Sequence, residues 1–349
     1  MAYSVLQADI DKDQEILTQL LQRNFGFAPE ARFEWIYKNS PSGYPTCLLL
    51  QHTETGTIVG SLSLFPRTIS IDGKSVQALI TGDLVVDKEH RAIGPALKLV
   101  KSAMSMCNQN ISGLLFGISN ANSYVVVQRS GFEILDDICE MTLVLSTYSY
   151  IRRLIPFSFI ARPLSFLLDF ALRVRDKGIF KRSKRNYAID FPRSFNERFD
   201  ELWEKQSKKY SFIGERSSRF LEWRFNQSPY HEYKVFTLAY PKEMSFLGYV
   251  VFYVDGKKIY VADLGFDGTE KSFTELISSF SLYQRGQGAE SVSLSIASQP
   301  ELINLLRHMG YSIRSKERKF LIYVPAELKA ILKSIKNGPL FLTSADNDV

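Results

Sequence analysis

The sequence predicts an α+β protein built from two tandem copies of one domain, each a mixed sheet flanked by helices. An internal repeat is the first observation: Glu34-Trp35 and Glu222-Trp223 stand in similar segments, and Asp72-Gly73-Lys74 recurs as Asp255-Gly256-Lys257. Second, helical and extended patterns alternate in the same order in both copies. Third, the 349 residues are 45% hydrophobic and 23% charged, which suits a folded protein and excludes a disordered chain, a coiled coil or a collagen-like fibre.

The repeat also sets the expected domain boundaries. Further matches follow in the same order in both copies, and their offset falls slowly along the chain, as loop shortening would produce. We expect a first domain at residues 1–148, a basic helical linker at 149–189, a second domain at 190–326 and a C-terminal tail at 327–349. The small and polar residues that end this tail predict fraying.

Each element of the first copy follows from its local pattern. Apolar residues at helical spacing predict helices, and β-rich runs around Asp72-Gly73 predict a hairpin. A glycine at the end of a short helix suits a left-handed cap. The expected elements are, in order, a helix at 13–25, strands at 57–70 and 75–86, a helix at 95–107, a buried strand at 112–117 and a short helix ending at Gly131.

The second copy repeats this order with shorter strands. Its expected elements are a helix at 195–209, strands at 246–254 and 258–264, a helix at 271–283, a buried strand at 291–296 and a short helix ending at Gly310.

Positive charge is concentrated in the linker. The chain has 43 Lys and Arg against 37 Asp and Glu, a net charge of +6. Ten basic and only two acidic residues lie between Tyr150 and Asn186, so the rest of the chain is slightly acidic. The basic character therefore belongs to one segment, and we do not expect a general nucleic-acid-binding surface.

The linker also contains the longest apolar stretch, Leu154 to Leu172. Two prolines, Arg162 and Asp169 interrupt it, so it is not expected to span a membrane. Two interpretations stay open. In one, it is a basic amphipathic helix that lies on an anionic membrane or binds a phosphorylated acceptor. In the other, which is the commoner arrangement, it is an interdomain helix that buries Phe166, Leu167, Phe170 and Val174.

Cysteine and histidine usage bounds the chemistry. Cys47, Cys107 and Cys139 are widely spaced and form no CxxC pair, which argues against a disulfide framework or a zinc site. Four histidines without an HExxH motif do not suggest a metalloenzyme. The N-terminus has no apolar segment of the kind found in signal peptides, so we expect a cytoplasmic protein.

The segment from Leu84 to Leu97 carries the clearest chemical signal. An apolar strand leads through R-x-x-G-x-A into an amphipathic helix. Free N–H groups and the helix dipole favour an anion at such a helix N-terminus. Gly94 permits close approach of a ligand, Arg91 adds a contact to phosphate, and Pro95 is expected at the first helical position. The alternative is an ordinary strand-to-helix turn that happens to contain Arg and Gly.

The order strand, R-x-x-G-x-A, helix, strand, and Asn120 eleven residues before Gly131 resembles the GNAT superfamily of acyl-CoA-dependent N-acyltransferases. The tandem arrangement is similar to that of two-domain bacterial members. In that family the loop cradles the coenzyme A pyrophosphate, and the preceding strand binds the pantetheine arm through its backbone. The resemblance thus implies acetyl-CoA or another acyl-CoA as cofactor, bound by Val85, Val86, Arg91, Ala92, Ile93, Gly94, Pro95, Ala96 and Asn120.

The catalytic candidates are Asp83 and Tyr124. Many family members carry a general-acid tyrosine at the position of Val127, so the nearby Tyr124 is the alternative here. Asp83 precedes the coenzyme-binding strand and could accept the proton of the amine. Its match to Asp263 in the second copy equally fits a shared structural task.

Two further features follow from the repeat. Glu34 and Trp35 could line an acceptor pocket, but their recurrence in the second copy favours packing. The second copy has no arginine between Leu264 and Glu270, where its phosphate loop would stand, so we expect it not to bind the coenzyme.

The resemblance implies transfer of an acetyl group from acetyl-CoA to a primary amine by direct attack in a ternary complex. An amino sugar or another cell-envelope precursor is the preferred acceptor, and the linker adds a peripheral contact with the inner membrane face as an option. One alternative is an aminoacyl-tRNA-dependent transferase of the peptidoglycan-bridge type, against which the intact R-x-x-G-x-A loop argues. Another is a non-catalytic module that binds acyl-CoA or docks on a membrane.

Overall fold

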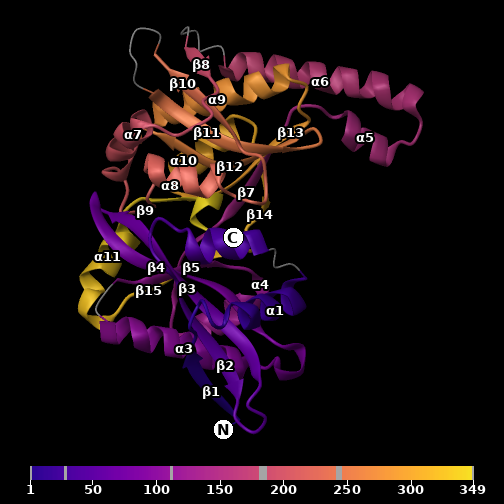
Figure 1. Cartoon of the computed structure of the whole chain (residues 1–349). Coiled ribbons are helices and arrows are strands. Elements are labelled where there is room, and N and C mark those ends of the chain that lie inside the picture. The colour runs from indigo at the N-terminus through magenta and orange to yellow at the C-terminus, as the bar shows by residue number, and fades with distance from the viewer. Residues whose placement is uncertain (1, 27–29, 111–112, 181–186, 241–245, 348–349) are drawn as a thin grey trace.

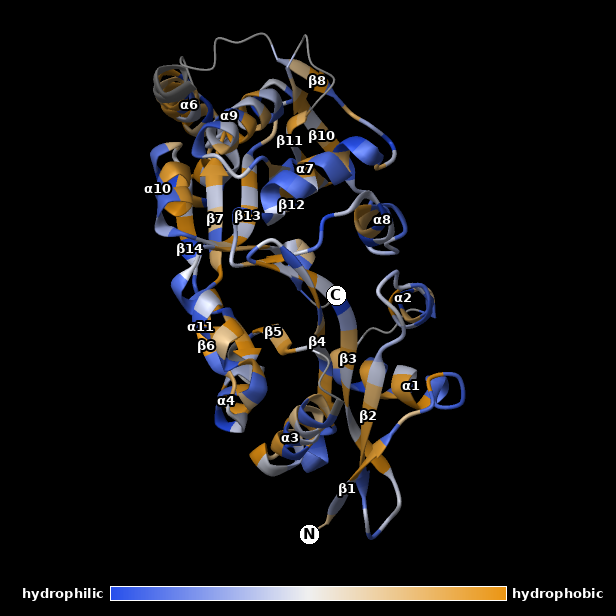
Figure 2. Cartoon of the chain, turned by 90° about the vertical axis from the view of Figure 1, so that its left-hand side faces the viewer, coloured by the Kyte–Doolittle hydropathy of each residue, from blue (hydrophilic) through white to orange (hydrophobic). Residues whose placement is uncertain are grey.

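In the computed structural model the chain forms two halves that share one continuous sheet (Figure 1). The structure describes residues 2–26, 30–110, 113–180, 187–240 and 246–347. The halves have the α+β architecture that the sequence predicts, a mixed sheet with helices on both faces. Figure 2 shows α3 and α4 on one side of the first half's sheet and α1 and α2 on the other, and the second half repeats this layering.

The first half contains seven strands and four α-helices among the described residues. Its elements are β1 (Tyr3–Gln7), α1 (Gln14–Phe25), α2 (Glu30–Phe33), the π-helical turn η1 (Glu34–Lys38), β2 (Thr46–His52), β3 (Ile58–Ile71), β4 (Lys74–Val86), the 3-10 turn η2 (Lys88–His90), α3 (Ile93–Asn110), β5 (Leu115–Ser119), α4 (Ala121–Ser130), β6 (Glu133–Asp137) and β7 (Cys139–Val144).

The second half follows a helical linker and ends in an additional helix and strand. The elements are α5 (Tyr148–Leu154), α6 (Ser158–Phe180), β8 (Ala188–Asp190), α7 (Glu197–Ser207), β9 (Phe212–Gly214), α8 (Ser218–Leu221), η3 (Glu222–Asn226), β10 (Lys234–Ala239), β11 (Phe246–Asp255), β12 (Lys258–Phe266), α9 (Glu270–Gly286), β13 (Ser291–Ser298), α10 (Pro300–His308), β14 (Ser312–Ser315), β15 (Lys319–Tyr323), η4 (Ala326–Leu328), α11 (Lys329–Asn337), β16 (Leu340–Thr343) and η5 (Ser344–Asp346).

The predicted helices and hairpins of both copies are present, with shifted ends. The Asp72-Gly73 turn joins β3 to β4, and both residues have positive φ, 51° and 78°, as a tight hairpin turn requires. The strand expected at 112–117 runs from Leu115 to Ser119, and residues 111–112 lie outside the described residues.

The two halves exchange one strand each. β7, from the first half, pairs with β13 and β14 of the second half. β15, from the second half, inserts between β5 and β6 of the first half. Each half therefore completes its sheet with a strand supplied by the other.

A reciprocal contact also joins the two copies of the Glu-Trp segment. The indole Nε1 of Trp35 donates to the backbone oxygen of Trp223 at 2.8 Å, and Trp223 Nε1 donates to the backbone oxygen of Trp35 at 3.0 Å. Both segments are single π-helical turns that follow a short α-helix. Their equivalent geometry supports the internal repeat and favours packing as the role of Trp35.

The expected fraying of the C-terminal tail is wrong for residues 327–347, whereas residues 348–349 lie outside the described residues. This segment forms α11 and β16, and Phe341, Leu342 and Asp346 are fully buried. β16 pairs with β13 and β9, so its apolar residues supply a strand at the centre of the sheet. The polar residues at the end are also held, because arginines surround Asp346.

The linker forms a helical hairpin, α5 and α6, on the second half (Figure 1). The commoner of the two sequence interpretations is wrong: Phe166, Leu167, Phe170 and Val174 are exposed. Small and polar residues of α6 face the protein instead. Among the described residues, no helix is long and apolar enough to cross a membrane. Four of the basic residues counted in the linker, Lys181, Arg182, Lys184 and Arg185, lie outside the described residues.

Candidate active site

A cavity of about 720 Å³ lies in the first half where β4 and β5 diverge. The two parallel strands pair only at Leu79 with Leu115 and at Ile80 with Phe116. Beyond this point residues 81–86 of β4 line one wall and residues 117–120 the other. The edge of β4 that faces the cavity has no strand on it, so its backbone groups are available to a ligand.

A β-bulge at Asp83 accompanies the divergence. Asp83 and Leu84 together face Leu62 of β3, and Asp83 has a positive φ of 50°. Such a bulge bends its strand and increases the local twist. Because residues other than glycine rarely adopt a positive φ, surrounding contacts must hold Asp83 in this conformation.

A buried ion pair supplies those contacts. Arg32 donates to both carboxylate oxygens of Asp83, at 2.7 and 3.0 Å, and the Tyr37 hydroxyl donates to Asp83 Oδ2 at 2.5 Å. Burial raises the pKa of Tyr37 well above its usual value, so the phenol stays protonated and can donate. With both carboxylate oxygens engaged, this geometry favours the structural role of Asp83 over that of a proton acceptor.

The loop after β4 is fixed to the end of α1. Arg23 forms a bidentate ion pair with Asp87, at 2.5 and 2.7 Å, and Asn24 Nδ2 donates to Asp87 Oδ1 at 2.8 Å. Arg91 donates from Nη2 to Asn24 Oδ1 and from Nε to the backbone oxygen of Val86, both at 3.2 Å. These bonds place the Arg91 guanidinium at the mouth of the cavity, where it stays exposed.

The N-terminus of α3 lies beside Arg91. The helix begins at Ile93 rather than at Pro95, so Pro95 is in the first turn and not at its first position. Its missing N–H costs nothing there, because the first four N–H groups of a helix have no intrahelical acceptor. A Cβ atom at Gly94 would meet no atom within 4 Å, which leaves open space beside the first turn of the helix.

The structure brings most of the predicted coenzyme-binding residues together. Those that line the cavity are Val85, Val86, Arg91, Ala92, Ile93, Ala96 and Asn120. Gly94 and Pro95 lie in the adjacent helical turn but not in the wall. Asn120 caps α4 by accepting from the backbone N–H and hydroxyl of Ser123, at 3.1 and 3.3 Å.

The catalytic candidates are placed differently from each other. Asp83 lies in the cavity wall, whereas Tyr124 is not among the described residues that line it. α4 presents Val126 and Val127 to the cavity instead. The position at which many GNAT enzymes carry a tyrosine is therefore part of an apolar wall.

Sequence reasoning missed several residues of this cavity. Ser119 ends β5, is 5% exposed, and its Oγ has no hydrogen-bond partner in the part of the chain that the structure describes. Nothing in the local sequence distinguishes this serine from others in the chain. Asn24 and Phe25 come from α1, and Leu321 comes from the exchanged strand β15, so only the tertiary structure brings them here.

The corresponding opening in the second half is filled. β12 and β13 pair only up to Val261 and Leu294, and β16 then pairs with β13 at residues 296–298. β16 thus occupies the place beside β13 that β12 leaves. This strand, together with the missing arginine loop, supports the expectation that the second copy does not bind the coenzyme.

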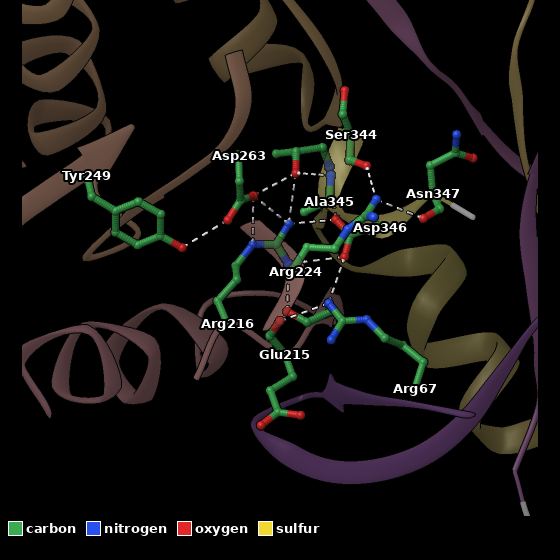
Figure 3. Close-up of polar contacts among 12 residues, drawn as sticks. Arg67, Glu215, Arg216, Arg224, Tyr249, Asp263, Ser344, Ala345, Asp346 and Asn347 are labelled. Atoms are coloured by element: carbon green, nitrogen blue, oxygen red, sulfur yellow. Dashed lines mark hydrogen bonds and ion pairs between the residues drawn. The ribbon is translucent and has the colours of Figure 1, made fainter. Parts of the chain in front are cut away.

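Ionic contacts fix β16 in that position (Figure 3). Asp346 accepts from Arg216 at 2.5 Å and lies 3.5 Å from Arg67 of β3, while Thr343 donates to Asp263 at 2.6 Å. Burial alone would raise the pKa of Asp346, but Arg216 and Arg67 outweigh it and lower the pKa. Asp346 therefore stays charged and links the C-terminal segment to both halves.

Comparison with known proteins identifies the class to which this site belongs. Residues 10–135 match the model of the acetyltransferase (GNAT) domain. This region contains β4, the loop at Arg91, α3 and β5, which together form the cavity. The first half of the chain thus belongs to the GNAT superfamily, whose members are acyltransferases.

Solved structures share the fold over nearly the whole chain. A GCN5-related N-acetyltransferase from Anabaena variabilis has a TM-score of 0.67 at 13% identity, covering 94% of this chain and 74% of its own. A probable N-acyltransferase from Enterococcus faecalis has a TM-score of 0.65 at 10% identity, covering 96% and 74%. N-myristoyltransferase of Saccharomyces cerevisiae with bound myristoyl-CoA has a TM-score of 0.57 at 15% identity, covering 92% and 82%. Among curated protein sequences, none matches this chain significantly.

Proposed function

We propose that this chain transfers an acetyl group from acetyl-CoA to a primary amine. The observation that carries the proposal is the cavity between the diverging strands β4 and β5, with the N-terminus of α3 and Arg91 at its mouth. An unpaired strand edge suits the amide groups of a pantetheine arm, and a helix N-terminus beside an arginine suits a pyrophosphate. When bound, the coenzyme supplies an activated thioester.

The residues present fit such a coenzyme. Residues 81–86 would hold the pantetheine arm along the open edge of β4, and Arg91 with the first turn of α3 would hold the phosphates. The fixed loop at Asp87 keeps Arg91 in place before any ligand arrives. This preorganisation lowers the ordering cost of binding.

Ser119 is the residue we assign to the reacting end of the ligand. Ser119 lies in the cavity wall at the end of β5, and its buried hydroxyl has no hydrogen-bond partner in the described structure. A hydroxyl in this setting can donate a hydrogen bond to an oxygen or sulfur atom of a bound substrate. Asp83 has a different task in this proposal: with Arg32 and Tyr37 it fixes the bulge that opens the cavity.

The acceptor we propose is an amino sugar or another amine-bearing precursor of the cell envelope, and the expected compartment is the cytoplasm. The choice of acceptor follows from the basic linker and from the similarity to large two-domain bacterial GNAT proteins. Release of free thiol from acetyl-CoA in the presence of a panel of such amines would identify the acceptor.

Calorimetric titration of the full chain with acetyl-CoA, longer acyl-CoAs and free coenzyme A tests the site. We expect micromolar binding at about one site per chain. Arg91→Ala removes a charge-assisted contact and should weaken binding about 10- to 100-fold. Gly94→Glu places a carboxylate in the open space beside the first turn of α3, where it fits sterically but repels the phosphates, and should weaken binding further.

Arg307→Ala is the matched control, because Arg307 is an exposed arginine on α10 in the second half. It should leave the affinity unchanged. Absence of binding by the unaltered chain, or equal loss of affinity in the Arg307 variant, would contradict the proposed coenzyme site.

A further inference from the structure

The helix α6 presents its large apolar side chains to solvent and its small ones to the protein. Ala161 is fully buried and Ser165 is 5% exposed, and both lie on the inner face. On the same face Asp169 accepts from the Thr147 backbone N–H at 2.6 Å and from the Ser146 hydroxyl at 2.9 Å. A surface helix ordinarily packs its apolar stripe against the protein core, whereas the apolar stripe of α6 faces solvent.

The exposed apolar surface is large and continuous with α5. Phe159 is 74%, Phe166 70% and Leu167 65% exposed, and Leu154 at the end of α5 is 83% exposed. Further exposed members of this surface, which we call the hairpin face, are Phe157, Ile160, Leu164, Leu168, Phe170 and Val174. Among the described residues outside this segment, Tyr44 alone of the large apolar and aromatic side chains is as exposed, at 70%. Contiguous patches of this kind mark interaction surfaces.

Positive charge surrounds the hairpin face. Arg152, Arg153, Arg162 and Arg173 are exposed, and none forms an ion pair with another described residue. Asp169, an acidic residue on the inner face of α6, is engaged by Ser146 and Thr147. The surface that α5 and α6 offer a partner is therefore apolar and cationic together.

We propose that the hairpin face docks on an anionic lipid bilayer, with α6 parallel to the membrane plane. Phenylalanine and leucine side chains would enter the boundary between headgroups and acyl chains, and the arginines would contact anionic headgroups, as interfacial amphipathic helices do. α6 cannot cross the bilayer, since Arg162, Pro163 and Asp169 interrupt its apolar stretch.

Charge complementarity favours lipid over a second copy of the chain. In a two-fold symmetric dimer the same patch meets itself, so the arginines of one hairpin would face those of the other. An anionic bilayer, in contrast, attracts every one of them. The hairpin also lies on the second half, away from α3 and the cavity of the first half, so docking leaves the coenzyme site open (Figure 1). The proposal therefore does not depend on the proposed acetyl transfer.

Co-sedimentation of the full chain with sucrose-loaded vesicles tests the proposal. Neutral phosphatidylcholine vesicles are compared with vesicles containing about 30% phosphatidylglycerol, at low and high salt. We expect binding to the anionic vesicles that weakens as salt rises. Phe166→Asp/Phe170→Asp should reduce the bound fraction at least tenfold, and Arg162→Gln/Arg173→Gln should remove the preference for anionic vesicles.

Tyr44→Asp is the control for the chemistry of the substitution, because it places one carboxylate at an equally exposed aromatic residue in the first half, and it should bind vesicles like the unaltered chain. Since all of the altered side chains are exposed, thermal unfolding should be unchanged in every variant. Three results would overturn the proposal: no sedimentation with either vesicle, a dimer in analytical ultracentrifugation that the double phenylalanine variant dissociates, or retention by bulk tRNA in place of anionic vesicles.

Discussion

At the residue scale, Ser119 and Asp83 show how position in the cavity separates two roles. Both are buried polar residues of the cavity wall, but Asp83 has its oxygens engaged by Arg32 and Tyr37, whereas no described residue is a hydrogen-bond partner of the Ser119 hydroxyl. A buried polar group without a partner costs about 1–3 kcal/mol in the unliganded protein. A ligand bound in the cavity would remove this cost by hydrogen bonding to the Ser119 hydroxyl.

Ser119→Ala is therefore predicted to lower kcat about 10- to 100-fold without lowering the melting temperature. The substitution removes a donor to the substrate but breaks no hydrogen bond within the protein. Thiol-release kinetics and thermal unfolding measure the two effects. Ser61→Ala is the control, since Ser61 is also buried with an unpaired hydroxyl but does not line the cavity. Equal loss of kcat in both variants would contradict the role of Ser119.

Most of the site residues that the sequence predicted belong to one continuous segment, and the spacing to Gly131 added Asn120. Arg91, its loop and the strand before it are close in the chain, so their spacing was informative. Asn24 and Leu321 reach the cavity from a distant helix and from the other half, and no local pattern marks them. The pairing of Asp83 with Arg32 depends on a bulge and on burial, which periodicity does not reveal.

At the element scale, β16 decides which half keeps an open space between its diverging parallel strands. In the first half the space beside β5 is the cavity, and in the second half the equivalent space beside β13 holds β16. The sequence could not predict this, because a four-residue strand after a helix near the C-terminus resembles an ordinary tail. Its partners lie on β9 and β13, far away in the chain.

Loss of the charge that holds β16 should destabilise the whole protein. In Asp346→Asn the buried Arg216 and Arg67 lose a counter-charge, and breaking a buried ion pair from one side costs about 3–5 kcal/mol. Burial already lowers the pKa of Arg67 to about 10, although Asp346 opposes this shift, so removing Asp346 should lower that pKa further. Urea unfolding measures the change in the free energy of unfolding. Asp255→Asn, in the exposed β11–β12 turn, is the control and should leave this free energy nearly unchanged. A loss below about 1 kcal/mol, the usual range for an exposed pair, would contradict this role of Asp346.

At the scale of the whole molecule, the exchange of β7 and β15 makes the two halves one folding unit. The repeat predicted two copies with the right elements, but not that each copy would complete its sheet with a strand from the other. The sequence similarity between the copies is the same whether β7 and β15 pair within their own half or with the other half. Only the tertiary structure distinguishes the two arrangements. The cavity depends on this exchange too, because Leu321 of β15 lines it.

We therefore predict that residues 1–148 alone are insoluble, and that co-expression with residues 149–349 yields a soluble complex. Without β15, the facing edges of β5 and β6 are unpaired, and β7 has no strand beside it. Exposed strand edges of this kind promote aggregation. Co-purification on a tag carried by one fragment measures the rescue. The second fragment with Phe320→Asp/Ile322→Asp should fail to rescue, since both side chains are fully buried in an apolar cluster that also contains Phe116 and Phe212. A soluble 1–148 fragment that unfolds cooperatively and binds acetyl-CoA by itself would show that the exchanged strand is dispensable.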